Sequence, residues 1–131
     1  MKSAKKICKN CGMCCQRTEM LVSELDIQLI AQTLNLTRND FIIINEFDIP
    51  QLKNKDNHCV FLDYTSKFCT IYKIRPKGCR FYPLVYDKDK SKCIYDSDCP
   101  RVKNFYLEKV DFQEVCNNLK NFIKSELKIK L

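Results

Sequence analysis

Residues 8–15 read CKNCGMCC and place four thiols within eight positions of the chain. Two of them, Cys14 and Cys15, are neighbours. Such a density has four explanations: disulfide bonds, a redox-active thiol pair, a metal site, or chance. Each explanation predicts something different about the other cysteines, so the interpretation of the whole sequence depends on this stretch.

The chain has 131 residues and ten cysteines, of which the remaining six are Cys59, Cys69, Cys79, Cys93, Cys99 and Cys116. The N-terminus carries lysines with no apolar segment after them, which predicts that a secretory signal is absent and that the protein is cytoplasmic. Because the cytosol keeps thiols reduced, the cysteines favour metal binding over a disulfide framework. One shared ion or cluster explains residues 8–15 most simply, and disulfides or a catalytic thiol pair are the alternatives.

The local spacing of the cysteines indicates which centres they suit. Cys8, Cys11 and Cys14 follow the C-x2-C-x2-C spacing of bacterial ferredoxin loops. Zinc ribbons use the same step, usually in two separated C-x2-C pairs. Thiolates suit zinc and iron–sulfur clusters equally, so the donor chemistry leaves the metal open. The fourth ligand must come from elsewhere in the chain, or Cys15 serves a second centre.

Size and composition predict a single folded domain. With 45% apolar residues and only two glycines and four prolines, the chain can bury a core and does not have the composition of a disordered segment. The longest apolar run covers residues 41–44, far too short to cross a membrane. The formal net charge of +7 is partly offset by any four-thiolate metal site, so it requires no nucleic acid, although it allows a weak anionic partner.

The segment between the two groups of cysteines is predicted to be helical. Residues 23–35 begin with Ser23 as N-cap and end at Asn35. Apolar residues recur in this segment at helical spacing, at Leu25, Leu29, Ile30 and Leu34. Residues 37–47 offer a capping box of Thr37 and Asp40, although the isoleucines at 42–44 suit a strand equally well.

The remaining segments predict short hairpins and a final helix. Residues 60–62 and 70–72 form the arms of one hairpin around a turn at 63–67, and residues 80–96 form a second around a charged turn at 87–92. Residues 101–130 predict a helix, with an N-terminus near Asp111 and Glu114. Its apolar stripe comprises Val115, Leu119, Phe122, Ile123 and Leu127. We therefore expect a small single α+β domain over residues 1–131, organised around cysteine-ligated metal, with its motifs in 8–100 and a helical segment in 101–130.

Four stretches carry a family resemblance: CKNCGMCC at 8–15, CVFLD at 59–63, FCTIYKIRPKGCRFYP at 68–83 and DCP at 98–100. In this order they resemble the CxxCxxCC cysteine-cluster family, the YkgJ-like zinc- or iron-chelating domains. The resemblance implies one or two metal sites, holding Zn²⁺ or an iron–sulfur cluster such as 4Fe–4S. The implied ligands are Cys8, Cys11, Cys14, Cys15, Cys59, Cys69, Cys79 and Cys99.

The resemblance leaves the activity open. Members of this family are loosely called Fe–S oxidoreductases, and a related domain occurs in a flagellin lysine N-methylase. We recognise no second domain in this chain, so the methylase activity is not carried over. Whether the protein is an enzyme is therefore left undecided.

Several residues near the motifs have predicted roles of their own. Arg75 and Arg80 flank Cys79 and are expected to donate hydrogen bonds that tune a bound metal. His58 is expected to be a solvated loop residue rather than a ligand. Cys93 and Cys116 lie outside the family motif, and Cys116 is expected to be a small buried apolar side chain on a helix.

These observations define two functional hypotheses. The first is a metal-thiolate protein with an iron–sulfur cluster that supports electron or group transfer. The second is a structural zinc-binding module or metal carrier without catalytic activity, in which the metal supplies folding energy. The expected partners are metal ions and, as a second option, another protein; the sequence shows no nucleic-acid signature and leaves the oligomeric state open.

Overall fold

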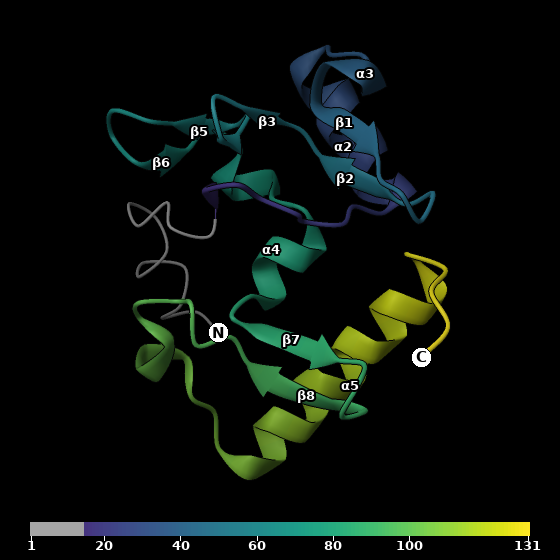
Figure 1. The fold of residues 1–131 in the computed structure, drawn as a ribbon, viewed down its shortest axis with the longest axis vertical. Coiled ribbons are helices and arrows are strands. Elements are labelled where there is room, and N and C mark those ends of the chain that lie inside the picture. Colours follow the sequence, from purple (N-terminus) through teal and green to yellow (C-terminus); the bar gives the residue numbers. More distant parts are fainter. Residues whose placement is uncertain (1–14) are drawn as a thin grey trace.

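The computed structural model describes residues 15–131, and Cys8, Cys11 and Cys14 lie outside the described residues. In this part of the chain, two α-helices precede three two-stranded antiparallel sheets, and a third helix, a fourth two-stranded sheet and a last helix follow (Figure 1). The predicted α+β class is therefore confirmed. The elements, in chain order, are α2 (Glu24–Leu34), α3 (Arg38–Phe41), β1 (Ile42–Ile44), β2 (Pro50–Leu52), β3 (Asn54–Lys55), β4 (His58–Cys59), β5 (Leu62–Asp63), β6 (Phe68–Cys69), α4 (Lys77–Phe81), β7 (Leu84–Asp87), β8 (Lys92–Tyr95) and α5 (Lys109–Ser125).

Helix α2 begins and ends where its capping residues predict. The Ser23 hydroxyl accepts a hydrogen bond from the Asp26 N–H at 3.2 Å, as an N-cap should. Asn35 ends the helix in the left-handed conformation, with φ of 53°. The capping residues therefore predicted both ends of this helix correctly.

The buried face of α2 differs from the predicted stripe. Ile27 and Ile30 are buried, whereas Leu25, at 62% exposure, and also Leu29 and Leu34, are exposed. Only Ile30 of the predicted stripe reaches the core. The buried face of the helix also carries Asp26, whose carboxylate accepts a hydrogen bond there.

Helix α3 is much shorter than the predicted helix over 37–47. The Thr37 N–H donates to Asp40 Oδ2 at 2.8 Å, so the capping box forms, and this hydrogen bond lowers the pKa of Asp40. The isoleucines that follow form β1 instead, which pairs with β2. Three consecutive β-branched residues favour the strand, which was the alternative interpretation.

The hairpins that carry the later cysteines turn tightly. Strands β3 and β4 are joined by Asp56 and Asn57, both with positive φ, at 54° and 68°, as a two-residue turn of type I′ requires. This hairpin was not predicted. Strands β5 and β6 pair Leu62 with Cys69, so the arms are shorter and shifted relative to the predicted 60–62 and 70–72.

Strands β7 and β8 form the second predicted hairpin, with its charged turn in the expected place. The final helix is shorter than predicted. Residues Val102–Phe105 form a 3-10 helix, and α5 begins only at Lys109. Leu119 and Phe122 are buried, as the predicted stripe requires. No helix within residues 15–131 has the length and apolar character needed to cross a bilayer.

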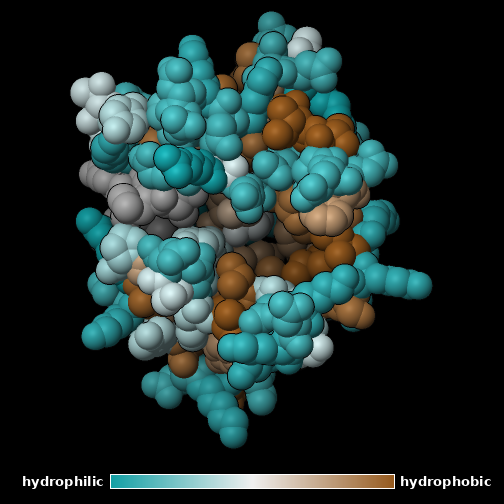
Figure 2. Space-filling model, viewed as in Figure 1, coloured by the Kyte–Doolittle hydropathy of each residue, from teal (hydrophilic) through white to brown (hydrophobic). Residues whose placement is uncertain are grey.

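Within residues 15–131, two large clusters of buried residues and a small third one form the core. The first lies among α2, β1, β2 and the hairpins β3–β4 and β5–β6, and the second lies between the β7–β8 hairpin and α5. Figure 1 shows α4 between these two parts of the molecule. A groove of about 540 Å³ runs between residues 16–21 and the second cluster, and Figure 2 shows apolar residues gathered around a hollow on this face.

Cys93 and Cys116 form a disulfide bond that joins β8 to α5, with their Cα atoms 5.9 Å apart. Cys116 is buried on the apolar side of α5, as predicted, but it is not simply a small apolar side chain. The disulfide gives a role to two cysteines that were not among the predicted metal ligands. Both residues lie outside the family motif, so the motif cysteines are unaffected.

A buried carboxylate anchors α4. Asp26 is 5% exposed, and its Oδ2 accepts a hydrogen bond from the Lys77 N–H at 3.0 Å, at the first residue of α4. At the same helix, the Lys77 ammonium lies 2.7 Å from a carboxylate oxygen of Glu126, at the end of α5. Helix α4 is thus bonded both to α2 and to the end of α5, and each of these helices lies far from α4 in the sequence.

Replacing Asp26 should loosen α4. In Asp26→Ala the Lys77 N–H loses its acceptor in a partly buried position, and the free energy of unfolding should fall by about 1–3 kcal/mol. Urea unfolding followed by circular dichroism measures this loss. Glu24→Ala, in the same helical turn but exposed, is the matched control and should change the stability by less than about 1 kcal/mol. Equal losses in the two variants would contradict the anchoring role.

Candidate metal centre

The segment that follows the cysteine-rich stretch is held as an extra strand beside β2 and the β3–β4 hairpin. The Val22 N–H donates to the Pro50 carbonyl at 3.0 Å, and the Leu52 N–H donates to the Met20 carbonyl at 2.9 Å. Leu21 also forms an antiparallel bridge with Gln51. An isolated bridge therefore joins this segment to β2.

A second isolated bridge lies next to two motif cysteines. Gln16 bridges His58, and the Arg17 N–H donates to the Asn57 carbonyl at 2.7 Å. Cys15 directly precedes Gln16, and Cys59 directly follows His58. The bridge therefore joins the chain next to two cysteines that are 44 positions apart in the sequence.

A side-chain amide locks the same pairing. Asn54 Oδ1 accepts from the Thr18 N–H at 3.0 Å, and Asn54 Nδ2 donates to the Thr18 carbonyl at 2.8 Å. Both backbone groups of Thr18 are thus satisfied by one side chain, as a neighbouring strand would satisfy them. Asn54 was not singled out from the sequence, because nothing local marks an asparagine that bonds across 36 residues.

Helix α4 closes on residues 16–22 from another direction. A Cβ atom added to Gly78 would lie 2.5 Å from the Met20 sulfur and 3.4 Å from the Leu21 carbonyl oxygen. The absence of a side chain at Gly78 permits this close approach. Cys79 follows directly, so the same contact brings its backbone toward the segment that begins at Cys15.

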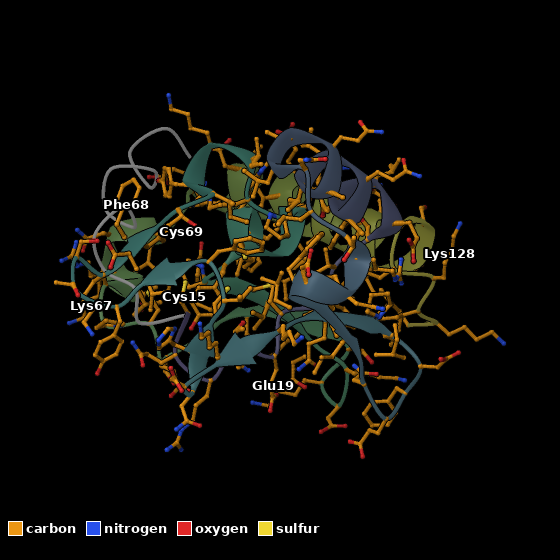
Figure 3. The ribbon with its side chains drawn as sticks, turned by 90° about the horizontal axis from the view of Figure 1, so that it is seen from above. Cys15, Glu19, Lys67, Phe68, Cys69 and Lys128 are labelled. Atoms are coloured by element: carbon orange, nitrogen blue, oxygen red, sulfur yellow. A yellow bond between two sulfur atoms is a disulfide. The ribbon has the colours of Figure 1, made fainter. Side chains whose placement is uncertain are left out.

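Four of the motif cysteines border the same core cluster. Cys59 is buried within the first cluster, on β4, and the half-buried Cys15, Cys69 and Cys79 pack against it. Figure 3 shows the labelled Cys15 and Cys69 on the same side of the molecule, with Lys128 on the opposite side. Four cysteines from four separate segments thus border one core cluster.

Cys99 occupies a different position. It is buried with Phe105 in a small third cluster, against which Tyr82 and Val102 pack. Tyr82 immediately follows α4, and its hydroxyl donates to Asp96 at 2.8 Å. Cys99 is therefore linked to the other motif cysteines through the end of α4 rather than through the first cluster.

The described cysteines do not by themselves form a preassembled site. Within residues 15–131, no three side chains of cysteine, histidine or carboxylate type are arranged so that they can hold one metal ion. The predicted ligand set also includes Cys8, Cys11 and Cys14, which lie outside the described residues. The eight-cysteine set therefore stays a prediction. The donor chemistry fits zinc or iron, because the converging groups are thiols in apolar surroundings.

The three accessory residues lie in defined surroundings. His58 is half-buried on β4 rather than on a solvated loop, and its ring stacks on Tyr64 with centroids 5.2 Å apart. Arg80 Nε donates to the Arg75 carbonyl at 3.1 Å, and the Arg75 guanidinium carbon lies 4.0 Å from the centroid of the Tyr72 ring. The expected hydrogen bonds from Arg75 and Arg80 to metal ligands stay a prediction.

Comparison with known proteins identifies the family. The family model CxxCxxCC, described as "Putative zinc- or iron-chelating domain", matches residues 7–117. The chain therefore belongs to this family, as its motifs indicated.

A curated relative is the uncharacterized protein MJ0661 of Methanocaldococcus jannaschii, with 35% identity over 80 residues. The matched part is 58% of this chain and 43% of that protein, so the match spans less than half of the relative. No solved structure matches.

The Asn54 amide provides a test of how the cysteine-bearing segment is held. In Asn54→Ala both backbone groups of Thr18 lose their partners, so the free energy of unfolding should fall by about 1–3 kcal/mol. Amide hydrogen exchange of residues 17–22 should also accelerate, because local opening becomes easier.

The matched control is Asn121→Ala, on the exposed face of α5, where little change is expected. Unchanged exchange in residues 17–22 of Asn54→Ala would contradict the assigned role of this amide.

Proposed function

We propose that this protein binds a transition metal as a cysteine-ligated centre, and that the centre is an iron–sulfur cluster. Membership of a zinc- or iron-chelating family supports metal binding. The observation that carries the proposal is the convergence of Cys15, Cys59, Cys69 and Cys79 on one core cluster. Thiols that merely filled a core would have no reason to gather from four segments that also carry the family motif.

The proposed ligands come from the predicted set. Cys8, Cys11 and Cys14 supply the closely spaced thiolates, and the cysteines that border the first cluster supply the remainder. The bridge between Gln16 and His58, the sequence neighbours of Cys15 and Cys59, supports the inclusion of both. Cys99 is included on the strength of its motif and its link to the end of α4. Such thiolates would bind as anions, so their thiol protons are released when the metal enters.

An iron–sulfur cluster is favoured over zinc by the ferredoxin-like spacing of Cys8, Cys11 and Cys14. When bound, such a cluster supplies a one-electron redox couple. The chain would then contribute the apolar surroundings of the first core cluster, which exclude water from the thiolates and thereby influence the reduction potential.

The second candidate is a structural zinc site. It is favoured by the architecture of residues 15–131. The four two-stranded sheets have strands of only two to four residues, and such small sheets supply little stability of their own. A metal that cross-links the hairpins would then contribute folding energy. Under this alternative the protein has no redox activity, and chelation unfolds it.

Metal analysis after oxygen-free purification separates the two candidates. We expect iron and acid-labile sulfide in comparable amounts, with a visible absorption that bleaches on reduction by dithionite. A colourless protein with stoichiometric zinc and no sulfide would reject the iron–sulfur assignment and support the structural zinc site. A folded protein with neither metal would overturn both.

Serine substitutions test the ligands. Cys59→Ser, Cys69→Ser and Cys79→Ser should each reduce the bound metal at least tenfold, because a hydroxyl is a much poorer ligand than a thiolate for these metals. The control is the double variant Cys93→Ser/Cys116→Ser, which removes two cysteines outside the proposed site and should retain the metal. Equal metal loss in the control and the ligand variants would indicate a general folding defect.

The cytoplasmic location stays a prediction as well. The Cys93–Cys116 disulfide points away from it, since structural disulfides are rare in reducing compartments.

A further inference from the structure

A small basic pocket lies beside α4. It has a volume of about 240 Å³ and is lined by Tyr72, Lys73, Arg75 and Arg80. Three of the four side chains are cationic and none is acidic. The pocket is formed where the short 3-10 helix Tyr72–Ile74 meets the start of α4.

Arg75 packs against a ring at this pocket, and one of its nitrogen donors makes no hydrogen bond within the described residues. The face of the Tyr72 ring supports its guanidinium group, whose carbon lies 4.0 Å from the ring centroid. The Nε atom of Arg75 is buried and has no hydrogen-bond partner. The terminal nitrogens of Arg75, which are not buried without a partner as its Nε is, are therefore the donors that this side chain offers to the pocket.

Among the described residues, the structure gives no carboxylate partner to Lys73 or Arg80. The ion pairs that the structure gives within residues 15–131 join Arg38 to Glu24 and Lys77 to Glu126, and neither involves the pocket. Arg80 uses its Nε on the Arg75 carbonyl, which leaves its terminal nitrogens available. Three positive charges therefore line one small concave site without a counter-charge from the described residues.

We propose that this pocket binds a small dianionic oxyanion of the phosphate type. Guanidinium groups match the spacing of oxyanion oxygens and form paired, charge-assisted hydrogen bonds with them. Two arginines and one lysine carry more positive charge than a single carboxylate can neutralise, so the dianion is favoured. The assignment uses Arg75 and Arg80 for an external ligand rather than for a metal-bound thiolate, and it does not depend on which metal is present.

Calorimetric titration of the full-length, metal-containing protein with inorganic phosphate tests the proposal. We expect saturable binding of one phosphate per chain, weakening as salt is added because the interaction is electrostatic. The double variant Lys73→Gln/Arg80→Gln should bind phosphate at least tenfold more weakly. Both residues are exposed, so the variant should fold, and its metal content should equal that of the wild type.

The control removes two positive charges elsewhere, in Lys90→Gln/Lys124→Gln, at exposed positions of the β7–β8 turn and α5. Phosphate affinity should stay within twofold of the wild type. Equal weakening in both double variants would show that only net charge matters and would overturn the proposal. It would also be overturned by the absence of saturable binding, by acetate binding as tightly as phosphate, or by metal loss in Lys73→Gln/Arg80→Gln with phosphate affinity unchanged.

Discussion

The pairing of residues 16–22 with residues 50–58 is the constraint on which the described structure depends. Backbone hydrogen bonds and two isolated bridges hold the segment, one joining Leu21 to Gln51 on β2 and the other joining Gln16 to His58 on β4. Between the two bridges, the Asn54 side-chain amide makes the hydrogen bonds to the Thr18 N–H and carbonyl that a neighbouring backbone would otherwise make. This pairing brings the chain that leaves the cysteine-rich stretch against the strand that ends in Cys59.

Helix α4 connects this arrangement to the rest of the molecule. Cys79 and Phe81 of this helix pack against the first and the second cluster, and Tyr82, which directly follows the helix, packs against the third. A five-residue helix is too short to be stable alone, so its position comes from outside contacts. The buried Asp26 carboxylate and the ion pair with Glu126 supply them, and both the proposed metal centre and the basic pocket depend on this small element.

The ten cysteines serve more than one purpose. The β8 strand and α5 bring Cys93 and Cys116 within bonding distance in the second cluster, while motif cysteines gather around the first. The basic residues divide in a similar way. Lys77 pairs with a carboxylate on α5, whereas Lys73, Arg75 and Arg80 line a pocket with no acidic side chain. Among these basic residues, Lys77 therefore has a structural partner, and the other three are the residues of the proposed anion site.

The sequence by itself determined the family, the α+β class and the elements with strong local signals. Ser23 and Asn35 mark the ends of α2, and Thr37 with Asp40 marks the start of α3, because capping acts between residues a few positions apart. Only the tertiary structure decided which face of α2 is buried, that Asp26 holds α4, that Asn54 holds Thr18 and that Cys93 joins Cys116. Each of these depends on contacts across 23 to 51 positions, and such contacts leave no periodic or local pattern in the chain.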